Sequence, residues 1–162
     1  MKKTVCLILV LCAALFSCAA PTPPLSYQNG LVRATFDVTL CGEEFTLCAI
    51  PCENSVEVVS PECLRGTRLV RGTAKYSLVS EGVETLLPDE LLAFSAPLFE
   101  LFSLSETSVE YDDKLGECRI KTDLGEYSVE LSQDGAPDRI SFEGARSFTA
   151  RNISVEYAAD GK

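Results

Sequence analysis

The sequence predicts an α+β fold in which a curved antiparallel sheet wraps around a short central pair of helices. Three observations lead to this prediction. Short apolar–polar alternations separated by turn residues fill both halves of the chain, which is typical of antiparallel strands. The strand pairings that successive turns impose all bury the same face of the sheet. Between the two halves, residues 88–104 have apolar side chains around almost the whole helical circumference, so we expect the sheet to bury this segment on most sides.

The N-terminus carries a short apolar run after two lysines. This run, residues 5–16, is too short to span a bilayer permanently and is typical of a signal peptide. The four residues that end at Cys18, Leu-Phe-Ser-Cys, resemble the bacterial lipobox, in which the cysteine is acylated and becomes the mature N-terminus. We therefore predict a lipoprotein signal peptide over residues 1–17 and a lipid anchor at Cys18 that holds the chain outside the cytoplasm, at the bacterial cell membrane. The alternatives are ordinary secretory cleavage near Ala19 or Ala20, which would give a soluble secreted protein, and an uncleaved anchor.

A proline-rich tether follows the predicted anchor. Residues 18–30 contain three prolines and few large apolar residues, so we expect an extended linker that lets the domain move freely. A single domain then occupies residues 31–157, and residues 158–162 form a tail. The mature chain is long enough for one ordinary hydrophobic core.

The charge of the chain excludes several classes of partner. The net charge is −10, and removal of the signal peptide leaves 12 basic and 24 acidic residues, a net charge of −12. This acidity argues against nucleic acid, and against an anionic membrane surface, as a direct docking partner. Histidine is absent, which removes the usual general base near neutral pH and the commonest metal ligand. We therefore expect neither an enzyme nor a cofactor.

The first half of the domain is predicted to be an antiparallel meander. Side chains from Val32 to Leu40 alternate, with the even-numbered residues on one face. A type II′ turn at Gly42-Glu43 would place Leu40 opposite Phe45. The next turn would place Ala49 opposite Val56 and Leu47 opposite Val58. A helical turn at 61–66 and strands at 68–72, 75–79 and 83–86 complete this half.

Residues 88–104 are predicted to form two short helices. Pro88 and Asp89 suit a helix start, because proline is tolerated in the first turn and an acidic residue there complements the helix dipole. Pro97 lacks a backbone N–H and its ring crowds the preceding turn, so we expect a break there, with helices near 89–95 and 97–103.

The second half is again a series of short strands. Aspartate- and glycine-containing turns separate them. The apolar positions change parity near Arg151 and Asn152, which predicts a β-bulge in the last strand. The predicted strands are 108–111, 117–122, 126–131, 138–142 and 147–157.

This order of elements resembles the lipoprotein-localisation-factor superfamily of LolA/LolB-like carriers and related lipid-binding lipoproteins. The resemblance covers residues 31–157, and it includes Pro-Glu-Cys-Leu-Arg-Gly at 61–66 and Asp-Gly-Ala-Pro-Asp-Arg-Ile at 134–140. It implies a half-barrel with helices as a lid over an apolar cavity that binds acyl chains, for the carriage or presentation of lipids. No functional residue of the family matches a definite position here, so none is carried over.

The apolar interior is the main candidate site. We predict that side chains of the sheet and the helices line a pocket for a hydrophobic ligand, an acyl lipid or a lipoprotein. They are Phe36, Phe45, Leu47, Leu91, Phe94, Leu98, Phe99 and Phe102. The same side chains would also suit a packed core that fills the half-barrel. In that case the protein would be an interaction module that binds an envelope protein through its sheet edge or its acidic face, and the sequence leaves both interpretations open.

Cys6 and Cys12 lie in the predicted signal peptide and would leave with it. Five cysteines then remain besides Cys18, an odd number, so they cannot all pair within one chain. These are Cys41, Cys48, Cys52, Cys63 and Cys118. The predicted register places Cys41 too far from Cys48 for a disulfide, whereas Cys52 and Cys63 are easier to join. The spacings lack the close pairs of a typical zinc site, so we predict no metal. Disulfides and free thiols stay open as alternatives.

Overall fold

The computed structural model describes residues 25–73, 75–104, 109–112, 116–132 and 134–158. The predicted signal peptide over residues 1–17, the acylated Cys18 and residues 159–162 of the tail lie outside the described residues, so these assignments stay predictions. Within the described ranges, no helix is both long and apolar enough to cross a membrane.

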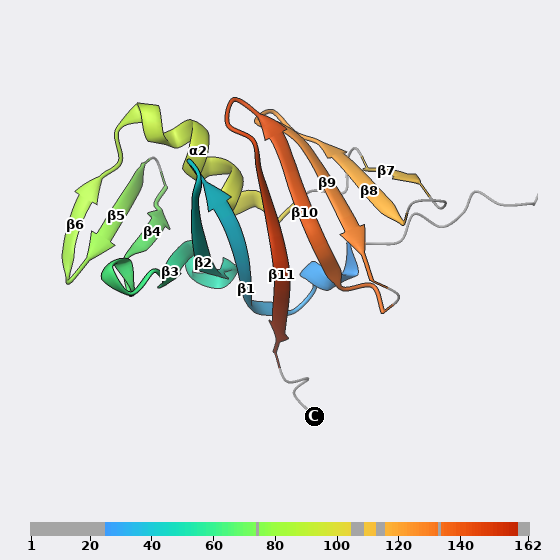
Figure 1. Cartoon of the computed structure of the whole chain (residues 1–162), viewed down its shortest axis with the longest axis horizontal. Coiled ribbons are helices and arrows are strands. Elements are labelled where there is room, and N and C mark those ends of the chain that lie inside the picture. Colours follow the sequence, from blue (N-terminus) through green and yellow to red (C-terminus); the bar gives the residue numbers. More distant parts are fainter. Residues whose placement is uncertain (1–24, 74, 105–108, 113–115, 133, 159–162) are drawn as a thin grey trace, which may run out of the picture.

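One curved antiparallel sheet of eleven strands forms the body of the described chain (Figure 1). Its strand order is β6-β5-β4-β3-β2-β1-β11-β10-β9-β8-β7, so two meanders are joined where the first strand pairs with the last. The N-terminal meander is β1 (Leu31–Leu40), β2 (Glu43–Ile50), β3 (Ser55–Ser60), β4 (Arg68–Arg71), β5 (Tyr76–Ser80) and β6 (Val83–Leu86). The C-terminal meander is β7 (Val109–Asp112), β8 (Glu117–Lys121), β9 (Gly125–Leu131), β10 (Pro137–Gly144) and β11 (Phe148–Tyr157).

The β1–β2 hairpin differs from the prediction in its register. Val38 lies opposite Phe45, so the turn is Cys41-Gly42 and the predicted turn at Gly42-Glu43 is wrong. Both turn residues have positive φ, 54° at Cys41 and 88° at Gly42, as a type I′ turn requires. The partner of Phe45 is thus two residues away from the predicted one, and because two is an even number the same side chains still share a face. The next pairing is confirmed, since Ala49 lies opposite Val56 as predicted.

The bulge predicted near Arg151 and Asn152 is confirmed. Thr35 pairs with Ser154 whereas Asp37 pairs with Arg151, so β11 has one residue more than β1 at this point. Asn152, with a φ of 51°, adopts the left-handed conformation. The bulge bends the sheet where its two meanders meet.

A second irregularity changes the face of the sheet on which the side chain of Val32 lies. The pairing of β1 with β11 shifts between Leu31 and Arg33. The alternation predicts that Val32 faces the core together with Ala34, but Val32 is 39% exposed and Leu31 is buried instead. The prediction is wrong because an extra residue at a bulge reverses the alternation beyond it.

A single helix, α2 (Asp89–Glu100), is present where the sequence predicts two. Pro97 lies inside it, so the predicted break is wrong. The missing N–H of Pro97 leaves the carbonyl of Ala93 without its usual helical partner. Tertiary packing compensates: Pro97 is buried, and its own carbonyl accepts a 3.1 Å hydrogen bond from the Tyr127 hydroxyl. Packing of this kind commonly overrides local preference.

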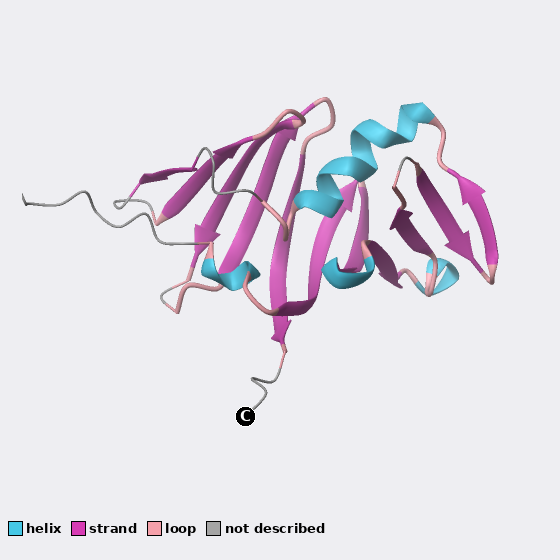
Figure 2. Ribbon diagram, turned by 180° about the vertical axis from the view of Figure 1, so that it is seen from behind, coloured by secondary structure: helices cyan, strands magenta, loops and turns pink. Residues whose placement is uncertain are grey.

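The hydrophobic core lies between α2 and the sheet face that it covers, which we call the inner face (Figure 2). The Phe36 ring on β1 contacts the Phe102 ring just beyond α2, with 5.5 Å between centroids. Two further short helices, η2 (Pro51–Glu53) and η3 (Glu62–Leu64), connect β2 to β3 and β3 to β4. The one at 62–64 confirms the predicted helical turn.

The domain begins before residue 31, its predicted start. Leu25 and Tyr27, in and beside the short helix η1 (Ser26–Gln28), are 3% and 2% exposed and belong to the core cluster. The prediction of a free tether over both residues is wrong, because it depends on the proline content and neglects that two large apolar side chains can dock on the sheet. The folded domain therefore includes residues from Leu25 onwards.

Candidate functional site

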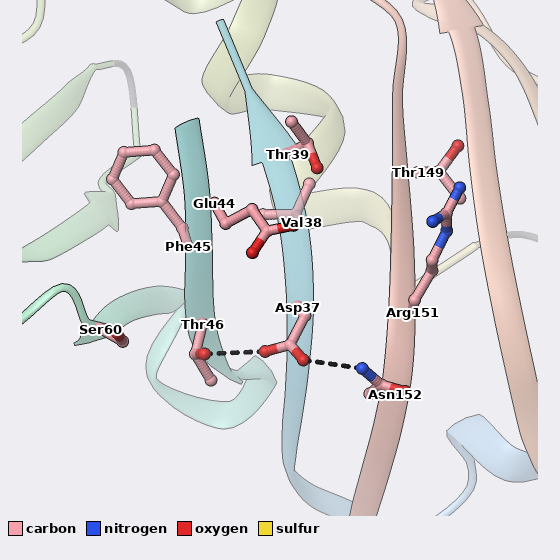
Figure 3. Close-up of a pocket in the computed structure, with 10 residues that line it drawn as sticks. All are labelled: Asp37, Val38, Thr39, Glu44, Phe45, Thr46, Ser60, Thr149, Arg151 and Asn152. Carbon is pink, nitrogen blue, oxygen red and sulfur yellow. Dashed lines mark hydrogen bonds between the residues drawn. The ribbon is translucent and has the colours of Figure 1, made fainter. Parts of the chain in front are cut away.

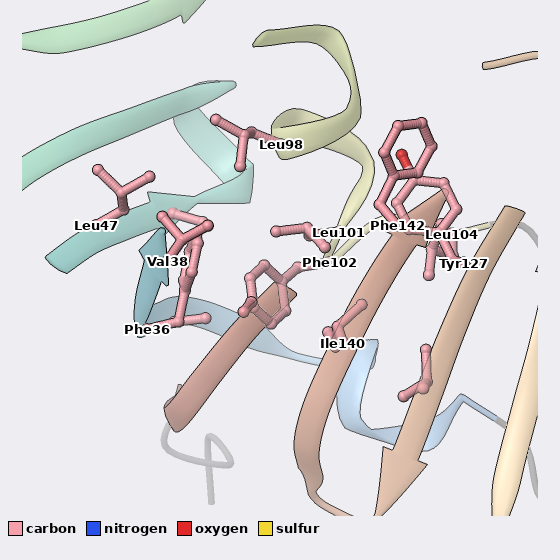
Figure 4. Close-up of a cluster of buried hydrophobic side chains, with 14 of the residues drawn as sticks. Phe36, Val38, Leu47, Leu98, Leu101, Phe102, Leu104, Tyr127, Ile140 and Phe142 are labelled. Carbon is pink, nitrogen blue, oxygen red and sulfur yellow. The ribbon is translucent and has the colours of Figure 1, made fainter. Parts of the chain in front are cut away.

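The structure divides the predicted pocket residues into a buried and an exposed group (Figure 4). Four of them belong to the buried core cluster, namely Phe36, Leu47, Leu98 and Phe102. Phe45 and Phe99 are partly buried against the same cluster. Leu91, in contrast, lies in the N-terminal half of α2 and is 50% exposed. The side chain of Phe94 lies outside the described part of the molecule.

One small cavity lies among the described members of this buried group. A cavity of about 40 Å³ lies between the sheet and the end of α2, with Val56, Phe99 and Phe102 in its wall. Ligand pockets typically have volumes of roughly 300–1,000 Å³. This cavity could hold a few water molecules but not an acyl chain. This cavity therefore does not account for ligand binding, and the uncovered part of the inner face is the next candidate.

The inner face is covered over the C-terminal meander. One cross-strand row of paired residues runs from Ala150 through Ile140 and Val129 to Cys118, and all four are fully buried. Side chains beyond α2, among them Leu101 and Leu104, pack on these strands (Figure 4). Tyr27 belongs to the same buried cluster as Cys118 and interacts with it electrostatically, so it adds to the cover there. We call the inner face of β8–β11 the closed half.

The inner face of the N-terminal meander becomes uncovered towards its edge. The equivalent row of paired residues is Ala34, Ala49, Val56, Leu69, Leu78 and Thr85. Its first three members are buried, Leu69 is partly buried, and Leu78 is 38% exposed. Val83 lies opposite Ser80, on the same face as Leu78, and is 66% exposed. We call this surface, formed by Leu69, Leu78 and Val83, the open wing.

The open wing ends in a charged rim beside α2. Arg71 follows Leu69 by two residues and therefore lies on the same face of β4. Its cross-strand partner is Tyr76, whose ring contacts that of Phe99 on α2 with 5.4 Å between centroids. Glu100, at the end of α2, shares a solvent-open hollow of about 360 Å³ with Arg71. Apolar and charged surfaces are thus adjacent on one strand.

Burial dominates the electrostatics of Glu100. It raises the pKa of this carboxyl above its ordinary value, and the charge of nearby Asp123 adds to the rise, while Arg71 and the Tyr127 hydroxyl oppose it. The Tyr127 hydroxyl lies 3.5 Å from Glu100 Oε2 and donates its better hydrogen bond, 3.1 Å long, to the Pro97 carbonyl. Burial also raises the pKa of Tyr127 far above the usual range. The Tyr127 side chain therefore acts as a neutral hydrogen-bond donor.

A polar hollow of about 300 Å³ lies on the opposite, outer face (Figure 3). Both carboxylate oxygens of Asp37 accept hydrogen bonds there, from Thr46 Oγ1 at 2.7 Å and from Asn152 Nδ2 at 2.9 Å. The bond from Asn152, followed by that from Thr46, lowers the pKa of Asp37. Since this carboxylate joins β1 to its two neighbours at the bulge, we assign it a structural role.

The cysteines of the described chain are free thiols. Cys41, Cys52 and Cys63 are exposed, whereas Cys48 and Cys118 are buried. The disulfide considered for Cys52 and Cys63 is absent because these residues precede and follow the six-residue strand β3, which spans roughly 20 Å. A disulfide needs Cα atoms within about 7 Å. Among the described residues, no group of three or more potential ligands could hold a metal ion.

The chain was compared with protein families, with curated proteins and with solved structures. No family model and no curated protein matches it. Three solved structures are similar over most of their length. They are an uncharacterised conserved protein from Thermus thermophilus (13% identity, 84% of this chain and 85% of that chain, TM-score 0.40), lipoprotein LppX from Mycobacterium tuberculosis (13%, 83% and 90%, 0.39) and a LolA superfamily protein from Nitrosomonas europaea (10%, 89% and 88%, 0.33).

The LolA-like resemblance noted in the sequence thus recurs among solved structures. A lipoprotein is also among the similar solved structures. Because each of these TM-scores is below 0.5, the likenesses carry no conclusion, and the function must be argued from the residues of this chain.

Sequence reasoning missed the residues of the open wing and its rim. Leu69 and Arg71 are predicted to lie in a strand, but their neighbours give no sign of which face stays uncovered. The exposed Leu78 and Val83 have the same alternation as buried positions elsewhere. The only available signal is the length of the helical segment, since a twelve-residue helix is roughly 18 Å long and cannot cover eleven strands.

Proposed function

We propose that this protein is an extracytoplasmic lipoprotein, anchored through an acylated Cys18, that binds a hydrophobic ligand at its inner face and carries or retains it at the cell envelope. One observation carries the proposal. The apolar row that forms the packed core continues onto the open wing, where Leu78 and Val83 remain exposed. An exposed apolar surface continuous with a core is typical of a binding site.

The chemistry of the open wing favours an acyl chain. The three side chains that define it, Leu69, Leu78 and Val83, are aliphatic, with the smaller polar Ser80 and Thr85 opposite Val83 and Leu78. Each methylene group that is removed from water contributes about 0.8 kcal/mol. An acyl chain that lies along β4–β6 would cover Leu69 and Leu78 in the way that α2 covers the neighbouring strands. An acyl lipid or the acyl part of a lipoprotein therefore suits the wing, and no catalytic step is needed.

A second candidate function rests on the edge of the sheet. β6 is the last strand on its side, and all four of its residues are exposed. Such an edge presents backbone groups that can pair with a strand of another protein. In this case the protein would be a non-enzymatic interaction module of the envelope, and Val83 would contact a protein partner.

Native mass spectrometry distinguishes the two candidates. The full chain with Cys18→Ser, which carries no acyl group of its own, is purified from a lipid-containing bacterial host without detergent. A co-purifying mass that extracts into organic solvent as a lipid supports ligand binding. A chain that stays free of lipid after incubation with mixed envelope lipids contradicts it and favours the interaction module.

The anchor is tested separately by cell fractionation. Cys18→Ala should move the protein from the membrane to the soluble fraction, because two or more acyl chains supply stable attachment and the acidic domain has no attraction for an anionic surface. The matched control is Cys63→Ala, which removes an exposed thiol from the folded domain. Unchanged tight membrane association of the Cys18 variant would show that the anchor assignment is wrong.

A further inference from the structure

The hollow at the rim of the open wing brings together three parts of the chain. Arg71 comes from the end of β4, Glu100 and Ser103 from the end of α2 and just beyond it, and residues 121–123 from the β8–β9 turn. The hollow therefore lies between the N-terminal and C-terminal meanders, beside the point where α2 ends. Its volume of about 360 Å³ is large enough for a small polar group.

Equal numbers of positive and negative side chains surround this hollow, and few groups stabilise the carboxylate of Glu100. Arg71 and Lys121 contribute two positive charges, and Glu100 and Asp123 two negative ones. Among the described residues, neither Arg71 nor Glu100 takes part in an ion pair. Glu100 is partly buried, and the Tyr127 hydroxyl contacts it at a long 3.5 Å. A partly desolvated carboxylate with such weak support is costly, and a cationic ligand group would relieve this cost.

The hollow also adjoins the apolar surface directly. Arg71 and Leu69 lie two residues apart on the same face of β4, so their Cα atoms are roughly 6–7 Å apart. Leu78 follows Leu69 in the cross-strand row. A ligand that lies along this row with its apolar part would therefore place a polar end at Arg71 and Glu100.

We propose that this hollow binds the headgroup of a zwitterionic glycerophospholipid, with the phosphate at Arg71 and the ammonium group at Glu100, while the acyl chains lie on the open wing. The inference rests on the proposed function and adds the class of lipid. A guanidinium matches phosphate through paired hydrogen bonds. A ligand with net negative charge would bring no group to neutralise Glu100 and Asp123, so the balanced site favours a headgroup that carries both signs.

Titration calorimetry with short-chain lipids tests this assignment. The full chain with Cys18→Ser is titrated with phosphatidylethanolamine, phosphatidylglycerol and diacylglycerol that share the same acyl chains. We expect phosphatidylethanolamine to bind tightest, by about tenfold or more over diacylglycerol, because charge-assisted hydrogen bonds are among the stronger ones. Arg71→Gln should reduce the affinity for phosphatidylethanolamine to that for diacylglycerol. Glu100→Gln should make the affinities for phosphatidylethanolamine and phosphatidylglycerol equal.

Arg68→Gln is the matched control. Arg68 lies on the same strand, but it points to the outer face and lies 3.7 Å from Glu53, so this change should leave all three affinities unaltered. Diacylglycerol binding by each variant shows that its wing is folded. Equal binding of the three lipids, with no effect of Arg71→Gln, would overturn the headgroup assignment and leave the wing as a lipid site. Absence of binding by all three would overturn the proposed function as well.

Discussion

The two halves of this sheet start from the same strand pair and end differently. From the centre at β1 and β11, the row through Ile140 and Val129 stays fully buried as far as Cys118. The row through Val56 and Leu69 is buried at first and reaches solvent at Leu78. Strand composition alone does not explain this difference, because both rows are apolar. The cover explains it: the closed half receives η1 and the residues that end and follow α2, and the open wing receives neither.

The N-terminal and C-terminal halves of α2 reproduce this contrast within one helix. Leu98 is 1% exposed and Leu91 is 50% exposed, although seven residues, or nearly two full turns, separate them. Leu98→Ala should lower the free energy of unfolding by about 2–5 kcal/mol, because it leaves a cavity in the core. Leu91→Ala should change it by less than about 1 kcal/mol. Urea titrations monitored by circular dichroism measure both; equal losses would contradict the division of the helix.

The cover of the closed half is tested by Leu25→Ala. Loss of this buried side chain should lower the free energy of unfolding by about 2 kcal/mol. It should also speed modification of Cys118, a buried thiol whose pKa is raised by burial, because η1 packs beside it. Mass spectrometry of peptides after brief exposure to a thiol reagent reports each cysteine, and the exposed Cys52 serves as the internal control. Unchanged protection of Cys118 would show that η1 is not part of the cover.

The smallest effect is expected where the halves meet. Hydrogen bonds lower the pKa of Asp37, so its ionised form stabilises the fold above the ordinary pKa, and this contribution is lost as the pH falls through the lowered value. Asp37→Asn should therefore reduce the free energy of unfolding at pH 7 by up to about 1 kcal/mol, since the group is partly exposed. The difference from the unmodified protein should shrink towards pH 3. Asp138→Asn, at an exposed position on β10, is the control. A difference that grows at low pH would contradict this sign.

Patterns of a few residues predicted the features that depend on interactions between near neighbours in the sequence. The pairing of Ala49 with Val56, the bulge at Asn152 and the helical turn after β3 follow from alternation and turn residues within a few positions. The predicted turn of the first hairpin differs from the observed Cys41-Gly42 by one position, because glycine suits more than one turn type.

Features that depend on distant contacts could not be predicted in this way. The helix continues through Pro97, which is buried and whose carbonyl accepts a hydrogen bond from Tyr127, thirty residues away. Leu25 and Tyr27 belong to the same buried cluster as residues of the C-terminal meander, such as Cys118 and Ile140. For the candidate site, alternation identified apolar side chains such as Phe36 and Leu98 but could not distinguish those that α2 covers from those that it leaves exposed.

Lipid binding by a pair of aspartate variants tests the central claim most directly. Leu78 on the open wing and Val32 at the β1 bulge are almost equally exposed, at 38% and 39%, so a charge at either position should disturb stability to a similar, small degree. Calorimetric titration of the full chain, with Cys18→Ser in both variants, should show that Leu78→Asp abolishes binding of a short-chain diacylglycerol and that Val32→Asp retains it. Retention of binding in both variants would contradict the assignment of the open wing as the lipid site.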